Sequence, residues 1–210
     1  MRSPIAKEGF VFVIPLAFLA AAFYSFSYYW AAGLFEGLFL FCAWFFRDPE
    51  RNIPQEPNVI VSPADGKVVE IIKESDPLLP NENYTRVSVF LNVFNVHVNR
   101  IPIAGKIQAV RYNKGKFLNA ASHKASLDNE QNAILLDNGS SKILVKQIAG
   151  LIARRIVCLA KEGDEYQLGQ RFGLIRFGSR TDIFVPTGTA IKVKEGDIVS
   201  GGSSIIGHLK

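Results

Sequence analysis

Three short stretches of the sequence carry residues that could do chemistry together: a carboxylate, an imidazole and a hydroxyl. Asp65 lies in "SPADGKVV", His97 in "NVFNVHVNRIP" and Ser179 in "FGSR". An unassisted serine is a poor nucleophile at neutral pH and needs a neighbouring base, which in turn needs an orienting group. Asp65, His97 and Ser179 could fill these three roles, because such triads are defined by geometry and not by sequence distance.

Two of these stretches also have a simpler structural interpretation. The order Pro-x-Asp-Gly around Asp65 is typical of a turn, because these residues favour turn dihedrals and local hydrogen bonds. Gly178-Ser179 stands between two strand-like runs, so it predicts a tight hairpin turn as readily as a reactive serine. Sequence spacing alone leaves both interpretations open.

His97 lies between two valines, and in an extended backbone its ring points away from both of them. A lone histidine on such a segment is more often a hydrogen-bonded structural residue than a base. Asn95 and Asn99, however, surround it with polar groups where a core strand would stay apolar. This polar setting favours a functional site.

The elements that must position these residues are short strand-like runs, which glycine, proline and asparagine interrupt. No long amphipathic helix is indicated in this region, so it is predicted to be mainly β. Residues 47–57, with three prolines and five charges, are expected to form an extended linker before a β catalytic domain at 58–210. The expected strands are Val59–Val61, Lys67–Ile72, Arg86–Leu91, Ile107–Tyr112, Ala133–Leu136, Ile143–Ile148, Ile152–Leu159, Leu174–Phe177, Asp182–Val185 and Ala190–Val193.

The C-terminal stretch "VKEGDIVSGGSSIIG", residues 193–207, resembles the repeating unit of barrel-sandwich hybrid domains such as biotinyl and lipoyl carriers. The carrier function does not follow, because the lysine-bearing hairpin of those proteins is absent. The expected fold of the catalytic domain is therefore barrel-sandwich-hybrid-like.

The N-terminal part has a different character. From Phe10 to Phe46 there is one charged residue, Glu36, and 15 of the 24 aromatic residues of the chain. Such a composition is typical of a membrane segment. A single helix of this length would rise about 55 Å, well beyond the roughly 30 Å hydrocarbon core of a bilayer, so a bend is expected.

The bend is expected in "SFSYYWAAG", residues 25–33, where small and interfacial aromatic residues interrupt the aliphatic run. Residues 1–46 are therefore predicted to form a membrane-associated helical hairpin with arms Phe10–Tyr28 and Ala32–Phe46. Basic residues flank both ends of the hairpin, and basic flanks favour the cytoplasmic side. The catalytic domain is accordingly expected to face the cytoplasm at the inner membrane. A cleaved signal peptide fits less well, because the apolar stretch is too long and has no evident cleavage site.

All 24 lysines and arginines lie outside this apolar stretch, so the rest of the chain is net positive. A basic domain beside a bilayer is attracted to anionic lipid headgroups by about 1 kcal/mol per basic residue close to the surface, although an ordinary solvated surface also fits. Nucleic acid is a poorer partner, because no basic run or stacking platform is present. The two cysteines and three histidines lack metal-site spacing, so no metal is expected.

In combination, the motifs resemble the short form of the phosphatidylserine decarboxylase proenzymes. The resemblance covers nearly the whole chain, with the motifs in a consistent order behind an apolar N-terminus. The matching pieces are "FFRDPER" at 45–51, "SPADGKV" at 62–68, "NVHVNRIP" at 95–102, "GKFLNA" at 115–120 and "FGSR" at 177–180.

The resemblance implies that the chain cleaves itself between Gly178 and Ser179 into a β chain, 1–178, and an α chain, 179–210. Ser179 would attack the Gly178 carbonyl while His97, held by Asp65, takes its proton. Ser179 would then become a pyruvoyl group, whose ketone forms a Schiff base with the serine amine of phosphatidylserine. Loss of carbon dioxide and reprotonation, for which His97 is the candidate donor, would give phosphatidylethanolamine.

The chain departs from the longer branch of this family at two positions. That branch has Gly-Ser-Thr at the cleavage site and a second histidine three residues after the first, whereas this chain has Arg180 and Arg100. Either arginine could bind the carboxylate or phosphate of the substrate, or be a surface residue. His123 is expected in a loop, either exposed or covering the site, and His208 is assigned no role.

Two other functions stay open at this point. One is a decarboxylase of another seryl lipid, such as an archaeal ether lipid, since the headgroup chemistry would be identical. The other is a non-enzymatic, membrane-tethered β-sandwich binding module in which "FGSR" is only a turn.

Overall fold

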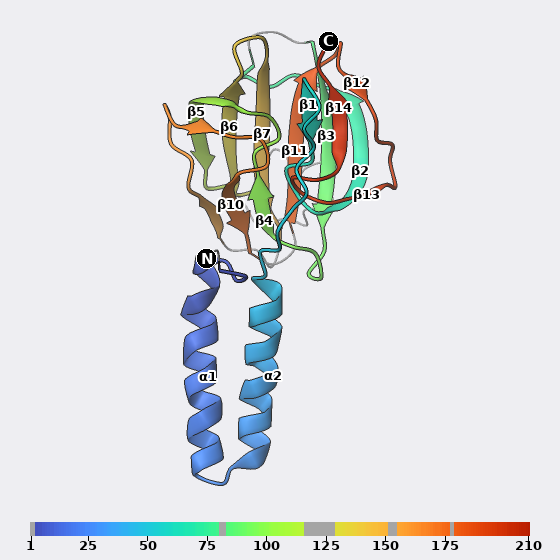
Figure 1. The fold of residues 1–210 in the computed structure, drawn as a ribbon. Helices are drawn as coiled ribbons and strands as arrows, with labels where there is room; N and C mark the ends of the chain where they lie inside the picture. Colours follow the sequence, from blue (N-terminus) through green and yellow to red (C-terminus); the bar gives the residue numbers. More distant parts are fainter. Residues whose placement is uncertain (1–2, 80–82, 116–128, 151–154, 177–178) are drawn as a thin grey trace. The chain divides into compact units, whose positions relative to one another are not determined.

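The structure is a computed structural model, and it describes residues 3–79, 83–115, 129–150, 155–176 and 179–210. The chain divides into two compact units, Met1–Glu50 and Arg51–Lys210. The first is helical and the second consists of β-strands (Figure 1). The predicted fold class, mainly β with an N-terminal helical pair, is confirmed.

The N-terminal unit begins with a 3-10 helix, η1 (Lys7–Gly9), followed by α1 (Phe10–Ser25) and α2 (Tyr29–Phe45). The two long helices are separated by a short turn in which Ser27 has a positive φ of 63°. The break therefore lies within the predicted bend, and α2 begins three residues before the predicted second arm.

The two helices pack against each other along their length. Phe23 stacks on Phe35 near the turn, with ring centroids 5.2 Å apart, and Phe12 stacks on Phe46 at the other end, at 5.5 Å. Because the end of α1 contacts the start of α2 and the start of α1 contacts the residue after α2, the two helices run antiparallel, as in a hairpin. The surface of α1 is apolar on all sides and only Val13 of this helix is buried, which is typical of a helix that contacts lipid. Lys7–Ser25 is long and apolar enough to cross a membrane, whereas α2 is shorter.

The second unit contains three antiparallel sheets. The largest has eight strands in the order β13-β2-β3-β11-β7-β6-β5-β9 and is visibly curled (Figure 1). The two smaller sheets have the orders β1-β14-β12 and β4-β10-β8. The strands are β1 (Val59–Val61), β2 (Gly66–Lys73), β3 (Tyr84–Leu91), β4 (Val98–Arg100), β5 (Gly105–Asn113), β6 (Gln131–Asp137), β7 (Lys142–Ala149), β8 (Ile156–Cys158), β9 (Glu165–Tyr166), β10 (Arg171–Ile175), β11 (Ser179–Pro186), β12 (Ala190–Ile191), β13 (Ile198–Val199) and β14 (Ile205–His208).

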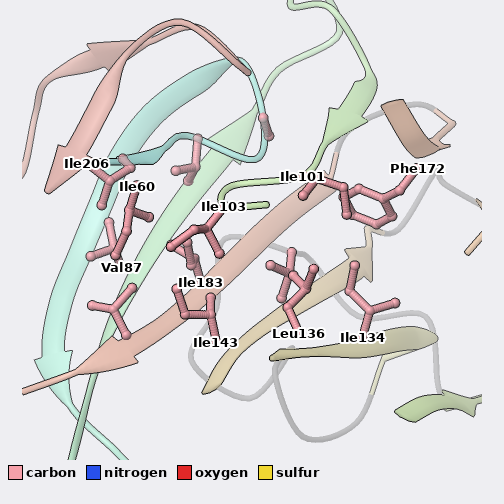
Figure 2. Close-up of a cluster of buried hydrophobic side chains, with 14 of the residues drawn as sticks. Ile60, Val87, Ile101, Ile103, Ile134, Leu136, Ile143, Phe172, Ile183 and Ile206 are labelled. Carbon is pink, nitrogen blue, oxygen red and sulfur yellow. The ribbon is translucent and has the colours of Figure 1, made fainter. Parts of the chain in front are cut away.

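One hydrophobic core joins the three sheets (Figure 2). Ile60 and Ile206 come from the β1-β14-β12 sheet, Phe172 from the β4-β10-β8 sheet, and Ile134 and Ile183 from the large sheet. All five side chains are fully buried. Burying a side chain of this size stabilises the fold by roughly 1.5–3 kcal/mol, so the core fixes the sheets against one another.

Of the two interpretations of Gly178-Ser179, the hairpin turn does not fit the pairing of the strands on either side. The strands on either side exist, but β10 pairs with β4 and β8, whereas β11 pairs with β3 and β7. They belong to different sheets and do not pair with each other. A strand pattern indicates which residues are buried but not which strand is the neighbour, because topology decides the pairing.

Two residues of the predicted linker contact the β domain. Arg51 forms an ion pair with Asp65, and the side chain of Ile53 fills the space beside Gly169. These residues belong to the second compact unit.

Candidate active site

Ser179 is the first residue of β11, in the interior of the large sheet. It pairs with Leu91 of β3 on one side and with Ala149 of β7 on the other, and it is fully buried. Its Oγ is buried and has no hydrogen-bond partner among the described residues. Most buried hydroxyl groups in proteins are hydrogen-bonded, so an unsatisfied one requires an explanation, and a catalytic role is one such explanation. Gly178, the other half of the predicted cleavage site, lies outside the described residues.

His97 directly precedes β4, and only 2% of the residue is exposed. Its Nδ1 lies 2.9 Å from the backbone carbonyl oxygen of Asn95. A carbonyl oxygen can only accept, so this hydrogen bond assigns the proton of a neutral ring to Nδ1 and leaves the lone pair on Nε2. His97 is therefore oriented as a base that acts through Nε2.

Asp65 lies in the loop between β1 and β2. Its carboxylate accepts hydrogen bonds from Nη2 of Arg51, at 2.9 and 2.8 Å, and from the backbone N–H of Gly201, at 2.8 Å. The carboxylate is thus held in one orientation from two sides. The predicted contact with His97 is not among these bonds, and the carbonyl of Asn95 orients the ring instead. A role of Asp65 towards His97 stays a prediction.

Backbone hydrogen bonds bring the segments that carry these residues together. The carbonyl of His97 accepts from the N–H of Ile175 at 3.2 Å, four residues before Ser179. The N–H of Arg100 donates to the carbonyl of Pro63, two residues before Asp65, at 2.9 Å. The loop before β2, the segment before β4 and the end of β10 therefore meet in one region.

The two arginines considered for substrate binding are both buried and bonded to protein groups. Arg180 alternates with Ser179 along β11 and so points to the opposite face of the sheet. There it forms an ion pair with Asp182, with Nε 2.9 Å from Oδ1. Arg100 donates from Nη1 to the carbonyl of Gly169 at 3.1 Å. These contacts favour structural roles, and substrate binding by either arginine stays a prediction.

Of the two other histidines, the structure describes only His208. His123 lies outside the described residues. His208, in β14, has its Nε2 2.7 Å from a carboxylate oxygen of Glu56. Among the residues that the structure describes, no group of three or more His, Cys, Asp or Glu side chains could hold a metal ion.

Sequence reasoning assigned no specific contacts to the residues that support the proposed catalytic groups. Arg51 stands in the "FFRDPER" motif, and Asn95 and Asn99 stand in the histidine motif. The only indication in the sequence that these residues matter is that they stand in the motifs that carry the family resemblance. The contact of Arg51 with Asp65 spans 14 residues of sequence, and no local pattern encodes such a pair, whereas Asn95 contacts His97 from two residues away.

Comparison of the sequence with known proteins identifies its family. A model of the family described as phosphatidylserine decarboxylase matches residues 38–207. The phosphatidylserine decarboxylase proenzyme of Syntrophotalea carbinolica is 48% identical over 210 residues, covering 100% of this chain and 98% of the relative. The proenzyme of Wolbachia sp. subsp. Brugia malayi is 46% identical, covering 98% of this chain and 91% of the relative. The proenzyme of Burkholderia vietnamiensis is 44% identical, covering 98% of this chain and 96% of the relative. With a family match over most of its length and relatives this similar from end to end, the chain belongs to the phosphatidylserine decarboxylase family.

Proposed function

We propose that the chain is a self-processing, pyruvoyl-dependent enzyme that converts phosphatidylserine to phosphatidylethanolamine and carbon dioxide in phospholipid biosynthesis. Family membership supports the decarboxylase activity. The observation that carries the self-processing is the buried, unsatisfied hydroxyl of Ser179 at the start of β11. No observation favours another seryl lipid as substrate or a non-enzymatic binding module.

Self-cleavage begins with His97 Nε2, which takes the hydroxyl proton of Ser179 while Oγ attacks the carbonyl carbon of Gly178. The bond from this carbon to the Ser179 nitrogen breaks, giving an ester and a free amine. Loss of the Ser179 α-proton then expels the Gly178 carboxylate by β-elimination. The remaining dehydroalanine takes up water and releases ammonia, so that a pyruvoyl group begins the α chain.

The surroundings of Ser179 fit a pyruvoyl group. Conversion removes the hydroxyl, and the Oγ of Ser179 has no hydrogen bond to lose among the described residues. A pyruvoyl group at this position would supply a ketone that reacts with the substrate amine and accepts the electrons left when carbon dioxide departs. His97 has a buried Nε2, and can hold the proton that the product needs.

The two chains produced by cleavage are expected to stay together as an α/β heterodimer. β11 begins at the cut and is paired with β3 and β7, both of which belong to the β chain. Its inward side chains, such as Ile183, are part of the common core. Leaving the sheet would expose this apolar surface and both rows of hydrogen bonds, which makes dissociation unfavourable.

The helical hairpin is proposed to hold the enzyme at the inner membrane, where its lipid substrate is found. The apolar surface of α1 supports membrane contact, and basic residues at both ends of the hairpin support a cytoplasmic catalytic domain. The net positive charge outside the hairpin suits an anionic phospholipid surface.

Denaturing electrophoresis with intact-mass measurement tests the proposal. The wild-type chain should separate into Met1–Gly178 and Ser179–Lys210, the smaller fragment lacking the mass of one ammonia relative to simple hydrolysis. Ser179→Ala should stay a single chain of 23.2 kDa. The wild type should also release carbon dioxide from phosphatidylserine vesicles. A folded wild-type chain that stays uncut would contradict the proposal.

A further inference from the structure

A row of buried polar side chains crosses from the large sheet to the β4-β10-β8 sheet. Asn132 of β6 donates from Nδ2 to Oε1 of Gln147 in β7 at 3.2 Å. Nε2 of Gln147 donates to Oδ1 of Asn99 in β4 at 2.9 Å. Nδ2 of Asn99 donates to Oγ1 of Thr181 in β11 at 3.3 Å. We refer to these four residues as the amide row.

The amide row is fully inside the protein. Asn99, Gln147 and Thr181 are 0% exposed and Asn132 is 3% exposed. A buried amide that loses its partner keeps the cost of desolvation without a compensating hydrogen bond. Gln147 and Asn99 each donate and accept within the row, so neither amide can turn over without breaking its bonds on both sides. The row therefore favours one placement of the strands that it joins.

Two members of the row lie close in sequence to the proposed catalytic residues. Asn99 is two residues after His97, and Thr181 is two residues after Ser179 on the same face of β11. Asn99 Nδ2 also lies 3.5 Å from the carbonyl of Pro63, in the loop that carries Asp65. A single side chain thus contacts or adjoins all three segments of the candidate site.

Gly173 of β10 leaves the space that the row needs. A Cβ atom added to this glycine would lie 3.0 Å from Nε2 of Gln147 and 2.2 Å from the carbonyl oxygen of Val157. Gln147 also donates to that carbonyl, at 3.4 Å. The glycine allows the amide to reach across β10 towards β4.

We propose that Asn99 and Gln147 are positioning residues, which hold the His97 segment at a fixed distance from the reacting end of β11. This inference rests on the proposed function, because it concerns the cleavage and decarboxylation assigned to that site. Neither side chain is required to touch the reacting atoms. Their effect comes from geometry, since a misplacement of about 1 Å can cost about 100-fold in rate.

Thr181 offers the sharpest test, because two near-isosteric variants separate its hydroxyl from its volume. Thr181→Ser keeps the acceptor for Asn99, whereas Thr181→Val removes it. The self-cleavage rate of the full-length chain, followed as loss of the uncut form, should be near wild type for Thr181→Ser and about 10-fold lower for Thr181→Val. Asn99→Leu and Gln147→Leu should slow cleavage by about 100-fold.

Leu144→Ala is the control for general loss of stability. Leu144 is fully buried in β7, on the face opposite Gln147, and belongs to a separate apolar cluster. This variant should lower the unfolding temperature at least as much as Gln147→Leu but cleave at the wild-type rate. The double variant Asn99→Leu/Gln147→Leu should cleave no more slowly than the slower single variant, because the two residues act through one row. In matured protein, Thr181→Val should lower kcat and leave KM for phosphatidylserine unchanged.

The outcomes separate this inference from the proposed function. If the wild type cleaves itself and Thr181→Val, Asn99→Leu and Gln147→Leu all cleave at the wild-type rate, the positioning role is wrong while the function stands. The same holds if Leu144→Ala is slowed as much as Gln147→Leu at equal stability. If the folded wild type does not cleave, the proposed function fails first.

Discussion

The imidazole of His97 is held through Nδ1, and this decides which of its nitrogens can accept a proton. His97→Asn keeps a donor for the Asn95 carbonyl but removes the basic nitrogen. Because positioned general bases contribute about 100- to 10,000-fold, self-cleavage of this variant should slow by that range. Cleavage is measured by electrophoresis of freshly folded full-length protein. Maturation at the normal rate would mean that another group acts as the base.

Asp65 is held by Arg51 and Gly201, and this arrangement allows its electrostatic and structural roles to be separated. Asp65→Asn keeps an acceptor for the Gly201 N–H but removes the negative charge, whereas Arg51→Met removes the cation and its hydrogen bonds but keeps the carboxylate. If the carboxylate acts on His97 during the reaction, Asp65→Asn should slow cleavage more than Arg51→Met does. Parallel time courses of the two variants test this order, and equal rates would indicate a structural role for the ion pair.

Cys158 is a partly buried thiol with no role in the proposed reaction, and its reactivity can be predicted. Burial is the main cause that raises the pKa of its thiol. A raised pKa means a smaller thiolate fraction at a given pH, and the thiolate is the reactive form. In a Cys42→Ser background, alkylation of Cys158 at mildly alkaline pH should be much slower in the native protein than in urea, as measured by mass. Equal rates would show that the thiol is accessible and ionises normally.

At the scale of elements, the sequence predicted strands whose burial follows a simple pattern. β3 and β7 are largely apolar and were expected, as was the second half of β11, whereas its polar first half, Ser179–Thr181, was not. β4 was not expected, because Val98-Asn99-Arg100 is mostly polar although all three residues are buried. Its polar side chains are satisfied by partners on other strands, such as Gln147 and Gly169. The local sequence does not indicate which distant residues will bond to these side chains, so neither β4 nor the amide row could be predicted.

Gly173 provides a test of how tightly β10 fits between its neighbours. In Gly173→Ala the new methyl group would lie 2.2 Å from the carbonyl oxygen of Val157, so the pairing of β10 with β8 must shift. Overpacking of this kind costs roughly 1–3 kcal/mol, and a fall in the thermal unfolding temperature should report it. Gly188→Ala is the matched control, because the nearest atom to its Cβ is 4.0 Å away. Equal stability of the two variants would contradict the close packing.

At the scale of the whole molecule, the division into a helical and a β unit was visible in composition alone. Fifteen of the 24 aromatic residues lie between Phe10 and Phe46, and every lysine and arginine lies outside that stretch. The sequence does not show that the segments carrying Asp65, His97 and Ser179 meet, because their meeting depends on which of the three sheets each strand joins. The family motifs indicated these three residues, but only the folded structure shows which backbone segments lie next to one another.

This division predicts that membrane attachment and self-cleavage are separable. Deleting residues 1–46 removes α1 and α2 but none of Asp65, His97 and Ser179. The shortened chain should therefore still cut itself, while Ser179→Ala in the same background should not. Its activity should fall more towards phosphatidylserine in vesicles than towards a short-chain, soluble phosphatidylserine, because only the vesicle substrate requires the enzyme at a bilayer.

Sedimentation with vesicles then separates the two sources of membrane affinity. Apolar helices resist salt, whereas attraction between basic residues and anionic lipids, at about 1 kcal/mol per residue, falls as salt screens it. The full-length chain should stay bound to phosphatidylserine-containing vesicles at high salt. The shortened chain should bind them only at low salt and should not bind neutral vesicles. Salt-resistant binding of the shortened chain would mean that the β unit carries an apolar membrane contact of its own.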